Sequence, residues 1–347
     1  MYERKGRPLP FFMEKLMKKA VLPGIKADLT LKSGAIPTLK AGEALIALKA
    51  AALNKRDWWI QQGLYAGLRF PLVPGSDGSG IVADVGHDAD QSWVGKSVII
   101  NPAFNWGQEE SHQGPDFQIL GLPQDGTFAE YVKVPVTQLH AKPEHLSFEE
   151  AAAIPLVGLT TYRALFTRAD LKPGEKLFIS GIGGGAATMA LQLAAAVHAE
   201  IYVSSSQNHK IEQAIALGAK GGVIYTQSNW AETLQTEAGQ FHVVLDSALG
   251  DSFESYLELC QAGGRIVFFG GTAGNIPELN GRRVFWKQLN IMGTTMGSPL
   301  DFKHMLAFVE QHKIKPVIEQ IFPLEDINMA FQKLNDPSAF GKIVIQI

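Results

Sequence analysis

Residues 177–186 read LFISGIGGGA, a short apolar stretch that runs directly into a glycine-rich turn. The apolar residues predict a buried strand, and the residues from the turn to about Val197 predict a helix. The pattern G-x-G-x-x-G/A is matched by Gly181, Gly183, Gly184, Gly185 and Ala186. Here the first glycine permits a tight turn, the second lets the backbone approach a pyrophosphate, and the small last residue lets the helix pack on the strand. Because the helix N-terminus offers free N–H groups to phosphates, we expect a dinucleotide site.

The alternation of strand and helix continues on the carboxyl side of this unit. A second strand, EIYVSSS at 200–206, is followed by a helical stretch at 208–217 that Gly218 ends. Further strand candidates read GVIY, FHVVLD, RIVFFG and NIMGT, with helical stretches between several of them. Strands this apolar are covered on both faces, which is typical of parallel sheets. We therefore predict an α/β fold with a Rossmann doubly wound parallel sheet.

The first 140 residues are organised differently. Short apolar runs such as 44–50 and 81–85 are broken by glycine and proline at close spacing, which predicts a β-rich domain. Ser147 and Glu150 have the spacing of a capping box, so a helix is expected there, and Pro155 is expected to kink or interrupt it. The tail from about residue 298 leaves the alternating pattern and ends in an apolar strand.

Length and composition narrow the class of protein. A chain of 347 residues is long enough for two domains, and a net charge of -3 gives no basic excess for nucleic acid or an anionic membrane. Residues 177–199 carry no charge, but their glycines, Gln192 and His198 favour a buried strand–turn–helix over a membrane span. The single cysteine, Cys260, excludes an internal disulfide framework. The single cysteine and the lack of a signal-peptide pattern at the N-terminus together indicate a cytoplasmic protein.

The end of the second strand distinguishes between cofactors. NAD-binding units usually place an acid there for the ribose 2′-hydroxyl. Here the strand ends in Ser204, Ser205 and Ser206, and no acid occurs from residue 201 until Glu212. Hydroxyls and the nearby Lys210 ammonium favour a 2′-phosphate, and so NADP(H), because such bonds are charge-assisted. The alternative is a solvated serine-rich turn beside an ordinary surface lysine.

Several segments together resemble one family. They are AALNKRDWWIQQGLY (51–65), VPGSDGSGIVADVG (73–86), DGTFAEYVKVP (125–135), LVGLTTYRAL (156–165) and the cofactor segment through LGAKGGVIY (217–225). The chain after about Met17 resembles the medium-chain dehydrogenase/reductase superfamily, in particular its zinc-free, quinone-oxidoreductase-like branch. It looks most similar to the bacterial subgroup labelled zinc-type alcohol dehydrogenase-like.

This resemblance implies an architecture and contacts with the cofactor. Residues 1–148 would form a GroES-like β-barrel substrate domain, residues 149–298 the NADP-binding Rossmann domain, and residues 299–347 a return to the substrate domain. Members are commonly dimers paired through an edge strand, here near 290–295. By the same carry-over, Thr161 would touch the nicotinamide ribose and Lys210 and Tyr225 the 2′-phosphate. The turn at Phe269 and Gly270 would lie on the nicotinamide side.

The resemblance also bears on metal binding. Where zinc alcohol dehydrogenases carry their catalytic ligands, this chain has Asn54, Ser76 beside Asp77, and Val157. No cysteine occurs between residues 101 and 135, where the structural zinc lobe would need four. Zinc requires three or four Cys, His or carboxylate ligands held together. We therefore predict that this chain has no zinc and no other metal site.

Without a metal as Lewis acid, exchange between an alcohol and a ketone is difficult, whereas a conjugated acceptor yields a delocalised anion. Asn54 and Tyr65 are the catalytic candidates, as donors to the developing oxyanion or as a proton source. Asn54 is alternatively a backbone-bonding loop residue and Tyr65 a half-buried aromatic that closes a loop. Trp58 and Trp59 are either a wall for a flat substrate or residues of the core or of an interface. Cys260 is expected to be a small buried hydrophobe.

The leading hypothesis is an NADPH-dependent reductase of small conjugated carbonyls, either quinones or α,β-unsaturated ketones and aldehydes. An alternative enzyme is a 2-enoyl thioester reductase, which would need a long acyl cleft and a basic patch. A different class of hypothesis is a redox sensor that binds NADPH without turnover. The sequence indicates no role for the residues before Met17.

Overall fold

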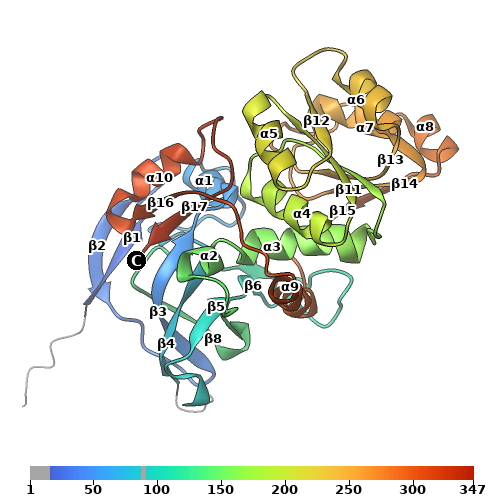
Figure 1. Cartoon of the computed structure of the whole chain (residues 1–347). Helices are drawn as coiled ribbons and strands as arrows, with labels where there is room; N and C mark the ends of the chain where they lie inside the picture. Colours follow the sequence, from blue (N-terminus) through green and yellow to red (C-terminus); the bar gives the residue numbers. More distant parts are fainter. Residues whose placement is uncertain (1–15, 87–90) are drawn as a thin grey trace, which may run out of the picture.

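The structure is a computed structural model that describes residues 16–86 and 91–347. Figure 1 shows two sheets side by side, one built from the middle of the chain and the other from its blue amino-terminal and red carboxyl-terminal parts. Within the described residues, no helix combines the length and the apolar character needed to cross a membrane.

The middle of the chain forms a sheet of six parallel strands in the order β12-β11-β10-β13-β14-β15. These strands are β10 (Lys176–Ile179), β11 (Glu200–Ser205), β12 (Gly221–Ile224), β13 (Phe241–Asp246), β14 (Cys260–Phe268) and β15 (Asn290–Gly293). This confirms the predicted doubly wound sheet. The chain moves outward from β10 to β12 and then returns to the other side of β10, and such a switch point opens a crevice at the carboxyl ends of the strands.

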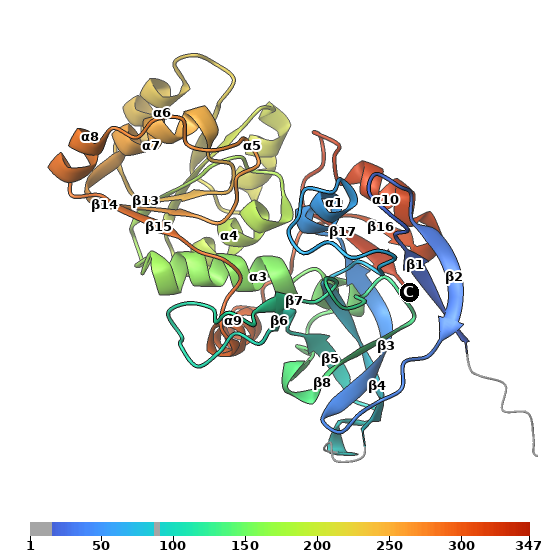
Figure 2. The same cartoon turned by 180° about the vertical axis from the view of Figure 1, so that it is seen from behind.

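Helices cover both faces of this sheet, as Figures 1 and 2 show from opposite sides. One face carries α3 (Pro155–Tyr162), α4 (Gly185–Ala196) and α5 (Asn208–Ala216); the other carries α6 (Trp230–Ala238) and α7 (Phe253–Leu259), and α8 (Gly281–Trp286) precedes β15. Successive strand residues point to opposite faces, so Leu177 and Ile179 join the core on the α4 side while Phe178 packs with Trp230 and Tyr256.

The second sheet has seven strands, in the order β16-β17-β3-β4-β5-β9 with β8 beside β3. They are β3 (Glu43–Ala52), β4 (Asp77–Val85), β5 (Ser97–Ile100), β8 (Tyr131–Pro135), β9 (Leu139–Ala141), β16 (Ile318–Pro323) and β17 (Lys342–Gln346). Two small antiparallel pairs accompany it: β1 (Leu16–Val21) with β2 (Thr30–Ala35), and β6 (Ala103–Phe104) with β7 (Gln118–Ile119). Helices α1 (Lys55–Gln61) and α10 (Ile327–Lys333) belong to this half.

The junction between the two halves follows the local sequence. The Ser147 hydroxyl accepts a hydrogen bond from the Glu150 N–H at 3.1 Å, and the Glu150 carboxylate accepts one from the Ser147 N–H at 2.8 Å, so the predicted capping box is confirmed. Helix α2 (Phe148–Ala152) ends before Pro155, which starts α3 as its first residue. Helix α9 (Pro299–Gln311) packs against α3, and the chain enters the seven-stranded sheet at β16. The domain boundaries at residues 148 and 298 remain predictions from the sequence.

Candidate active site

The glycine turn lies at the switch point of the parallel sheet, between β10 and α4. Gly181 has a φ of +63° and Gly183 a φ of +145°, conformations that disfavour residues with a Cβ atom. The turn is held to β11 because the Gly181 N–H donates to the Ser204 hydroxyl at 3.1 Å and the Ile182 N–H to the Ser204 carbonyl at 2.7 Å. Gly184 caps α4 without a side chain, so the first N–H groups of the helix are left for an anion.

The three serines at the end of β11 have different surroundings. Ser204 and Ser205 are buried, and their hydroxyls accept backbone N–H groups, from Gly181 and from Gln207 at 3.1 Å respectively. Ser206 is exposed just beyond the strand. Tyr225 lies beside this end because its N–H donates to the Ser205 carbonyl at 3.0 Å, and its side chain is 41% exposed. Ser206 and Tyr225 are thus the accessible members of the predicted 2′-phosphate set.

Lys210, in the first turn of α5, lies directly over the glycine turn. A Cβ atom added to Gly183 would lie 2.7 Å from the Lys210 Nζ atom. The residue is only 8% exposed, and this burial lowers the pKa of its ammonium, an effect that the carboxylates of Asp336 and Glu319 partly offset. Among the described residues it makes no ion pair. An anion at the glycine turn would therefore meet a partly desolvated cation.

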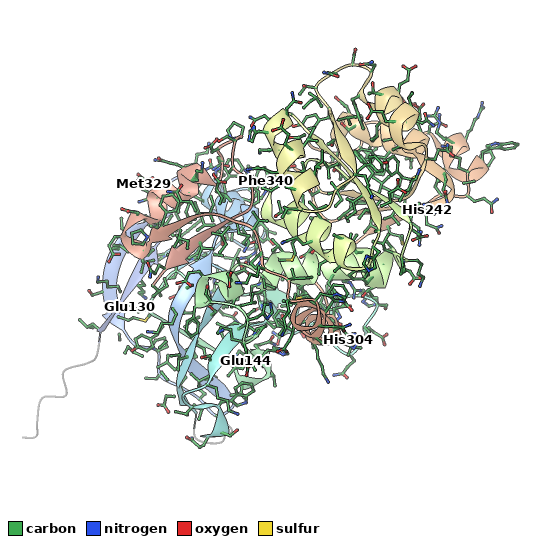
Figure 3. All side chains as sticks on the ribbon, in the orientation of Figure 1. Glu130, Glu144, His242, His304, Met329 and Phe340 are labelled. Carbon is green, nitrogen blue, oxygen red and sulfur yellow. The ribbon has the colours of Figure 1, made fainter. Side chains whose placement is uncertain are left out.

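A loop from the other half of the chain closes over the same turn. The Gly341 N–H donates to the Gly183 carbonyl at 2.8 Å, and the methylenes of Lys342 lie so close to Gly185 that a Cβ atom there would be 2.5 Å from Cδ. Phe340, which Figure 3 labels between the two halves, is 4% exposed and packs in the core of the parallel-sheet domain. Residues 339–342 thus connect the glycine turn with the seven-stranded sheet.

Asn54 stands between the end of β3 and the start of α1. It is 5% exposed, and its N–H donates to the Asp57 carboxylate at 2.8 Å. Asp57 also accepts the Gly75 N–H at 3.2 Å, so one fully buried carboxylate fixes both loops. Burial raises the pKa of Asp57 to about 6, against the opposing effect of the Arg56 guanidinium. Asp57 therefore positions the backbone around Asn54.

The Asn54 side chain belongs to a buried polar network with Asp77 and Lys342. The Lys342 ammonium donates to the Leu53 carbonyl at 2.7 Å, to Asn54 Oδ1 at 2.7 Å and to Asp77 Oδ2 at 2.9 Å. Asn54 Nδ2 donates to Asp77 Oδ2 at 2.8 Å, and the Leu156 N–H donates to Asp77 Oδ1 at 2.8 Å. Because an ammonium group can only donate, the Asn54 atom that faces Lys342 must be the acceptor Oδ1, and Nδ2 therefore faces Asp77. Sequence reasoning missed Lys342.

The other positions aligned with zinc ligands lie around this network. The Ser76 hydroxyl donates to the Leu120 carbonyl at 2.7 Å and accepts from Arg56 Nη1 at 3.0 Å. Val157 is buried and follows Leu156, whose N–H binds Asp77. Within residues 16–86 and 91–347, no three His, Cys, Asp or Glu side chains are grouped so that they could hold a metal ion.

Trp58 and Trp59 belong to α1, and Tyr65 follows this helix in the chain. The Arg56 guanidinium stacks 4.9 Å from the Tyr65 ring centre, and the half-buried ring packs on the core of the seven-stranded sheet. The Tyr65 hydroxyl has no hydrogen-bond partner in the part of the chain that is described. Trp58 and Trp59 meet edge to face at 4.6 Å, both half-buried. The Lys55 ammonium lies 4.4 Å from the Trp58 ring and joins this pair to the 334–341 loop through Asn335.

The remaining predicted contacts lie on α3 and at the end of β14. Thr161 is fully buried, and its hydroxyl donates to the Val157 carbonyl at 2.7 Å within α3. Phe269 and Gly270 follow the carboxyl end of β14, on the same edge of the sheet as the glycine turn, and both are partly exposed. The structure thus brings Phe269 and Gly270 to the crevice, while Thr161 is engaged inside its own helix.

Comparisons with known proteins agree with this architecture. Residues 40–144 match the alcohol dehydrogenase GroES-like domain, and residues 185–311 match the zinc-binding dehydrogenase family. A zinc-type alcohol dehydrogenase-like protein of Leptosphaeria maculans is 34% identical over 98% of this chain and 100% of its own length. An acryloyl-coenzyme A reductase of Metallosphaera sedula is 29% identical, with 95% of this chain and 99% of the relative covered.

Among solved structures, an NAD-dependent alcohol dehydrogenase superposes with a TM-score of 0.90 at 35% identity, covering 95% of this chain and all of that one. The parallel sheet with its glycine turn and the GroES-like sheet occur together in this family. The chain belongs to the medium-chain dehydrogenase/reductase superfamily of oxidoreductases.

Proposed function

We propose that the protein is an NADP(H)-dependent, zinc-independent oxidoreductase that transfers hydride to a conjugated carbonyl, such as a quinone or an α,β-unsaturated ketone or aldehyde. The observation that carries this proposal is the buried network of Asn54, Asp77 and Lys342. It lies where the family resemblance aligns the catalytic zinc ligands, and it supplies an amide and an ammonium.

The residues around this network do not fit zinc. The three aligned positions offer the Asn54 amide, the Ser76 hydroxyl and the Val157 hydrocarbon, whereas zinc prefers thiolate, imidazole or carboxylate ligands. The nearby Asp77 carboxylate accepts hydrogen bonds from Asn54, Leu156 and the Lys342 ammonium. A divalent cation would have to displace these donors and lie beside a fixed positive charge. We therefore propose that these residues act without a metal.

Asn54 is the proposed donor to the substrate oxygen. One of its Nδ2 hydrogens binds Asp77, and the second has no acceptor among the described residues. Because Lys342 and Asp77 hold the amide on both sides, this second N–H is fixed in direction, as stabilisation of a developing oxyanion requires. Bound NADPH supplies the hydride. Tyr65, whose hydroxyl is unpaired, is the proposed proton source for the enolate that follows.

The preference for NADPH is proposed from Lys210, Ser206 and Tyr225. The end of β11 has no carboxylate, and the partly desolvated ammonium of Lys210 lies beside Gly183. Ser206 and Tyr225 are exposed at the same end of the sheet. These groups can form charge-assisted hydrogen bonds with a 2′-phosphate, whereas the 2′-hydroxyl of NADH would gain little from them.

Stopped-flow oxidation of NADPH and of NADH on chelator-treated protein tests the proposal, with 1,4-benzoquinone and 9,10-phenanthrenequinone as acceptors. We expect rapid consumption of NADPH without added metal and much slower consumption of NADH. Lys210→Ala should raise the KM for NADPH by roughly tenfold and that for NADH by less, because the ammonium beside Gly183 also lies near the pyrophosphate site that both cofactors share. Lys220→Ala, at an exposed lysine of the same domain, is the matched control. Activity that returns only with zinc would overturn the assignment of Asn54.

A 2-enoyl thioester reductase is the second candidate, because a relative at 29% identity is named an acryloyl-coenzyme A reductase. Crotonyl-coenzyme A in the same assay distinguishes it, since an enoyl thioester reductase would consume NADPH with this acceptor and not with the quinones. Tight binding of NADPH without turnover of any of the three acceptors would instead support the redox sensor.

A homodimer is also proposed, paired through β15. Among the described residues this edge strand pairs only with β14, and the preceding helix α8 presents Phe285 and Trp286 with 67% and 82% of their surfaces exposed. Exposed aromatic side chains beside an open strand edge are typical of a surface that another chain covers.

A further inference from the structure

A cavity of about 520 Å³ lies at the carboxyl end of β15, beside the π-helical segment Arg163–Arg168 that continues α3. The loop at 105–117, which lies beside α9 in Figure 1, forms its other wall. Its polar lining consists mainly of Ser111, His112, Arg163, Arg168, Thr294 and Thr295. The cavity thus has two guanidinium groups and an imidazole in its wall, and none of its lining residues is acidic.

One of the two arginines is neutralised inside the protein. Arg163 forms a buried ion pair with Asp301 and also donates to the Ser111 carbonyl at 2.6 Å. The Asp301 carboxylate additionally accepts the Thr167 hydroxyl at 2.7 Å and the Ser298 N–H at 3.0 Å. Asp301 is therefore engaged by these three residues and makes no ion pair with Arg168 in the described part of the chain.

Arg168 has no such partner. Within residues 16–86 and 91–347 its side chain takes part in no ion pair and no hydrogen bond, and its Nε atom is buried without an acceptor. The Thr294 hydroxyl, in the same wall, is also buried and unpaired. A buried polar group without a partner is unfavourable, and these two groups find none among the described residues.

We infer that this cavity binds the carboxylate or phosphate group of a small molecule, with Arg168 as its main charge partner. A guanidinium matches both groups with two parallel hydrogen bonds, and the threonine hydroxyls and His112 add further donors. A neutral ligand would leave the charge of Arg168 uncompensated.

The Asn54 network and the cavity lie along the same helical segment. Helix α3 begins beside the network, where the Leu156 N–H binds Asp77, and Arg168 lies twelve residues later, in the segment that continues this helix. At up to 1.5 Å per residue this separates the two by at most about 18 Å along the helix. An acceptor with a tail of this length and an anionic end would occupy both places. This assignment of the anion to a substrate rests on the proposed function; the binding of an anion does not.

The experiment has two arms, each with wild-type protein, Arg168→Gln and Arg168→Lys. In the first arm, isothermal titration of the NADPH-loaded protein with inorganic phosphate measures anion binding directly. We expect Arg168→Gln to weaken it by roughly tenfold and Arg168→Lys to retain part of it. In the second arm, the KM for crotonyl-coenzyme A is compared with that for neutral 1,4-benzoquinone. Lys303→Gln, at an exposed lysine of α9 outside the cavity, is the matched control.

A loss of phosphate binding in Arg168→Gln supports the site. If the KM for crotonyl-coenzyme A also rises while that for benzoquinone does not, the anion belongs to the substrate; if both KM values stay unchanged, it is a free anion. Unchanged phosphate binding together with unchanged KM values would overturn the inference. The inference would also be overturned if Arg168→Gln changed the sedimentation coefficient but neither phosphate binding nor the KM values. The cavity would then be part of an interface between copies of the chain. Failure of all turnover in wild type leaves the first arm intact and counts against the proposed function alone.

Thr294→Val, which removes the second unpaired donor, should weaken phosphate binding in the same direction even if Arg168→Gln does not fold.

Discussion

Lys342 places a positive charge in the interior, with its side chain 4% exposed and all three ammonium hydrogens bonded. Removing one partner of a buried pair leaves the other charge without compensation. Lys342→Met should therefore lower the free energy of unfolding by about 3–5 kcal/mol, measured by urea denaturation. Lys315→Met, which breaks a pair with Glu150 at a lysine that is 58% exposed, should cost less than about 1 kcal/mol.

The outcome of a second substitution separates charge from packing. If the unpaired carboxylate is what destabilises Lys342→Met, adding Asp77→Asn should recover part of the loss. Equal losses for Lys342→Met and Lys315→Met would contradict the buried-pair argument.

Asp57 should make the stability depend on pH. Burial raises its pKa from 3.8 to about 6, so in the folded protein it still holds a proton at pH values where the unfolded chain has lost it. The stability that Asp57 contributes therefore falls as pH rises from about 4 to about 6 and is constant above, a change of about 3 kcal/mol. Asp57→Asn cannot ionise. The unfolding free energy of wild type minus that of Asp57→Asn should therefore fall by this amount between about pH 4 and about pH 7. A difference that does not change with pH would be evidence against the raised pKa.

Cys260 should be inert in the folded protein. It is fully buried, and this burial raises the pKa of its thiol to about 12 despite Lys287 and Arg265 nearby. Because the thiolate is the reactive form, dithionitrobenzoate at about pH 8 should label the single cysteine only after unfolding in concentrated urea. Rapid labelling of native protein would show that the α7 end opens. The prediction of a small buried hydrophobe at Cys260 is consistent with this burial.

How far the residues of the site could be predicted depended on how local their signal is. Asn54 stands in a recognisable segment of the sequence, and in the structure its amide binds Asp77, the residue after Ser76. Lys342 gave no signal, because its contact with Leu53 spans 289 residues and depends on the pairing of β17 with β3. The engagement of the Ser204 hydroxyl with the glycine turn was also invisible, since it requires the register between two neighbouring strands.

At the scale of elements, the start of α4 distinguishes two adjacent glycines. A Cβ atom on Gly185 would lie 2.5 Å from the Cδ atom of Lys342, whose stem is held at its far end by three hydrogen bonds. Gly184 has a φ of -70°, and a Cβ atom there would meet nothing within 4 Å. Gly185→Ala should therefore destabilise the cofactor-free protein by about 1–3 kcal/mol, and Gly184→Ala should change it by less than about 0.5 kcal/mol.

Thermal and urea denaturation of both variants check this prediction. Equal stability of Gly185→Ala and Gly184→Ala would mean that the Lys342 stem can move aside at no cost.

Elements with strong local patterns were predicted from the sequence. The apolar strands of the parallel sheet, the capping box at Ser147 and the interruption at Pro155 all follow from side chains close in the chain. The predicted start of β14 is wrong. The sequence predicts a strand from Arg265, whereas β14 begins at Cys260. Its first residues, which include Gly263 and Gly264, lack the composition of a strand and are held by pairing at Phe241.

At the scale of the whole molecule, the open edge of β15 predicts how copies associate. Trp286→Lys should convert the proposed dimer to a monomer, because a charge would replace an aromatic side chain that is 82% exposed in the single chain. Sedimentation equilibrium measures the change. Met329→Lys, at a position 56% exposed on α10 and labelled on the opposite side of Figure 3 from this edge, is the control and should leave the mass unchanged. A wild-type protein that sediments as a monomer would remove the dimer proposal.

The place of β17 has a consequence for the order in which the protein forms. This strand lies between β16 and β3 in the seven-stranded sheet, although it is made long after β3. While the chain emerges from the ribosome, the parallel sheet has all of its strands before the other sheet does. Residues 50–52 of β3 then wait with one side unpaired, because β8 pairs only with residues 43–47. The half of the protein that is synthesised first is therefore completed last, and a nascent chain stalled before residue 342 would expose that side to chaperones or to the same strand in a neighbouring copy.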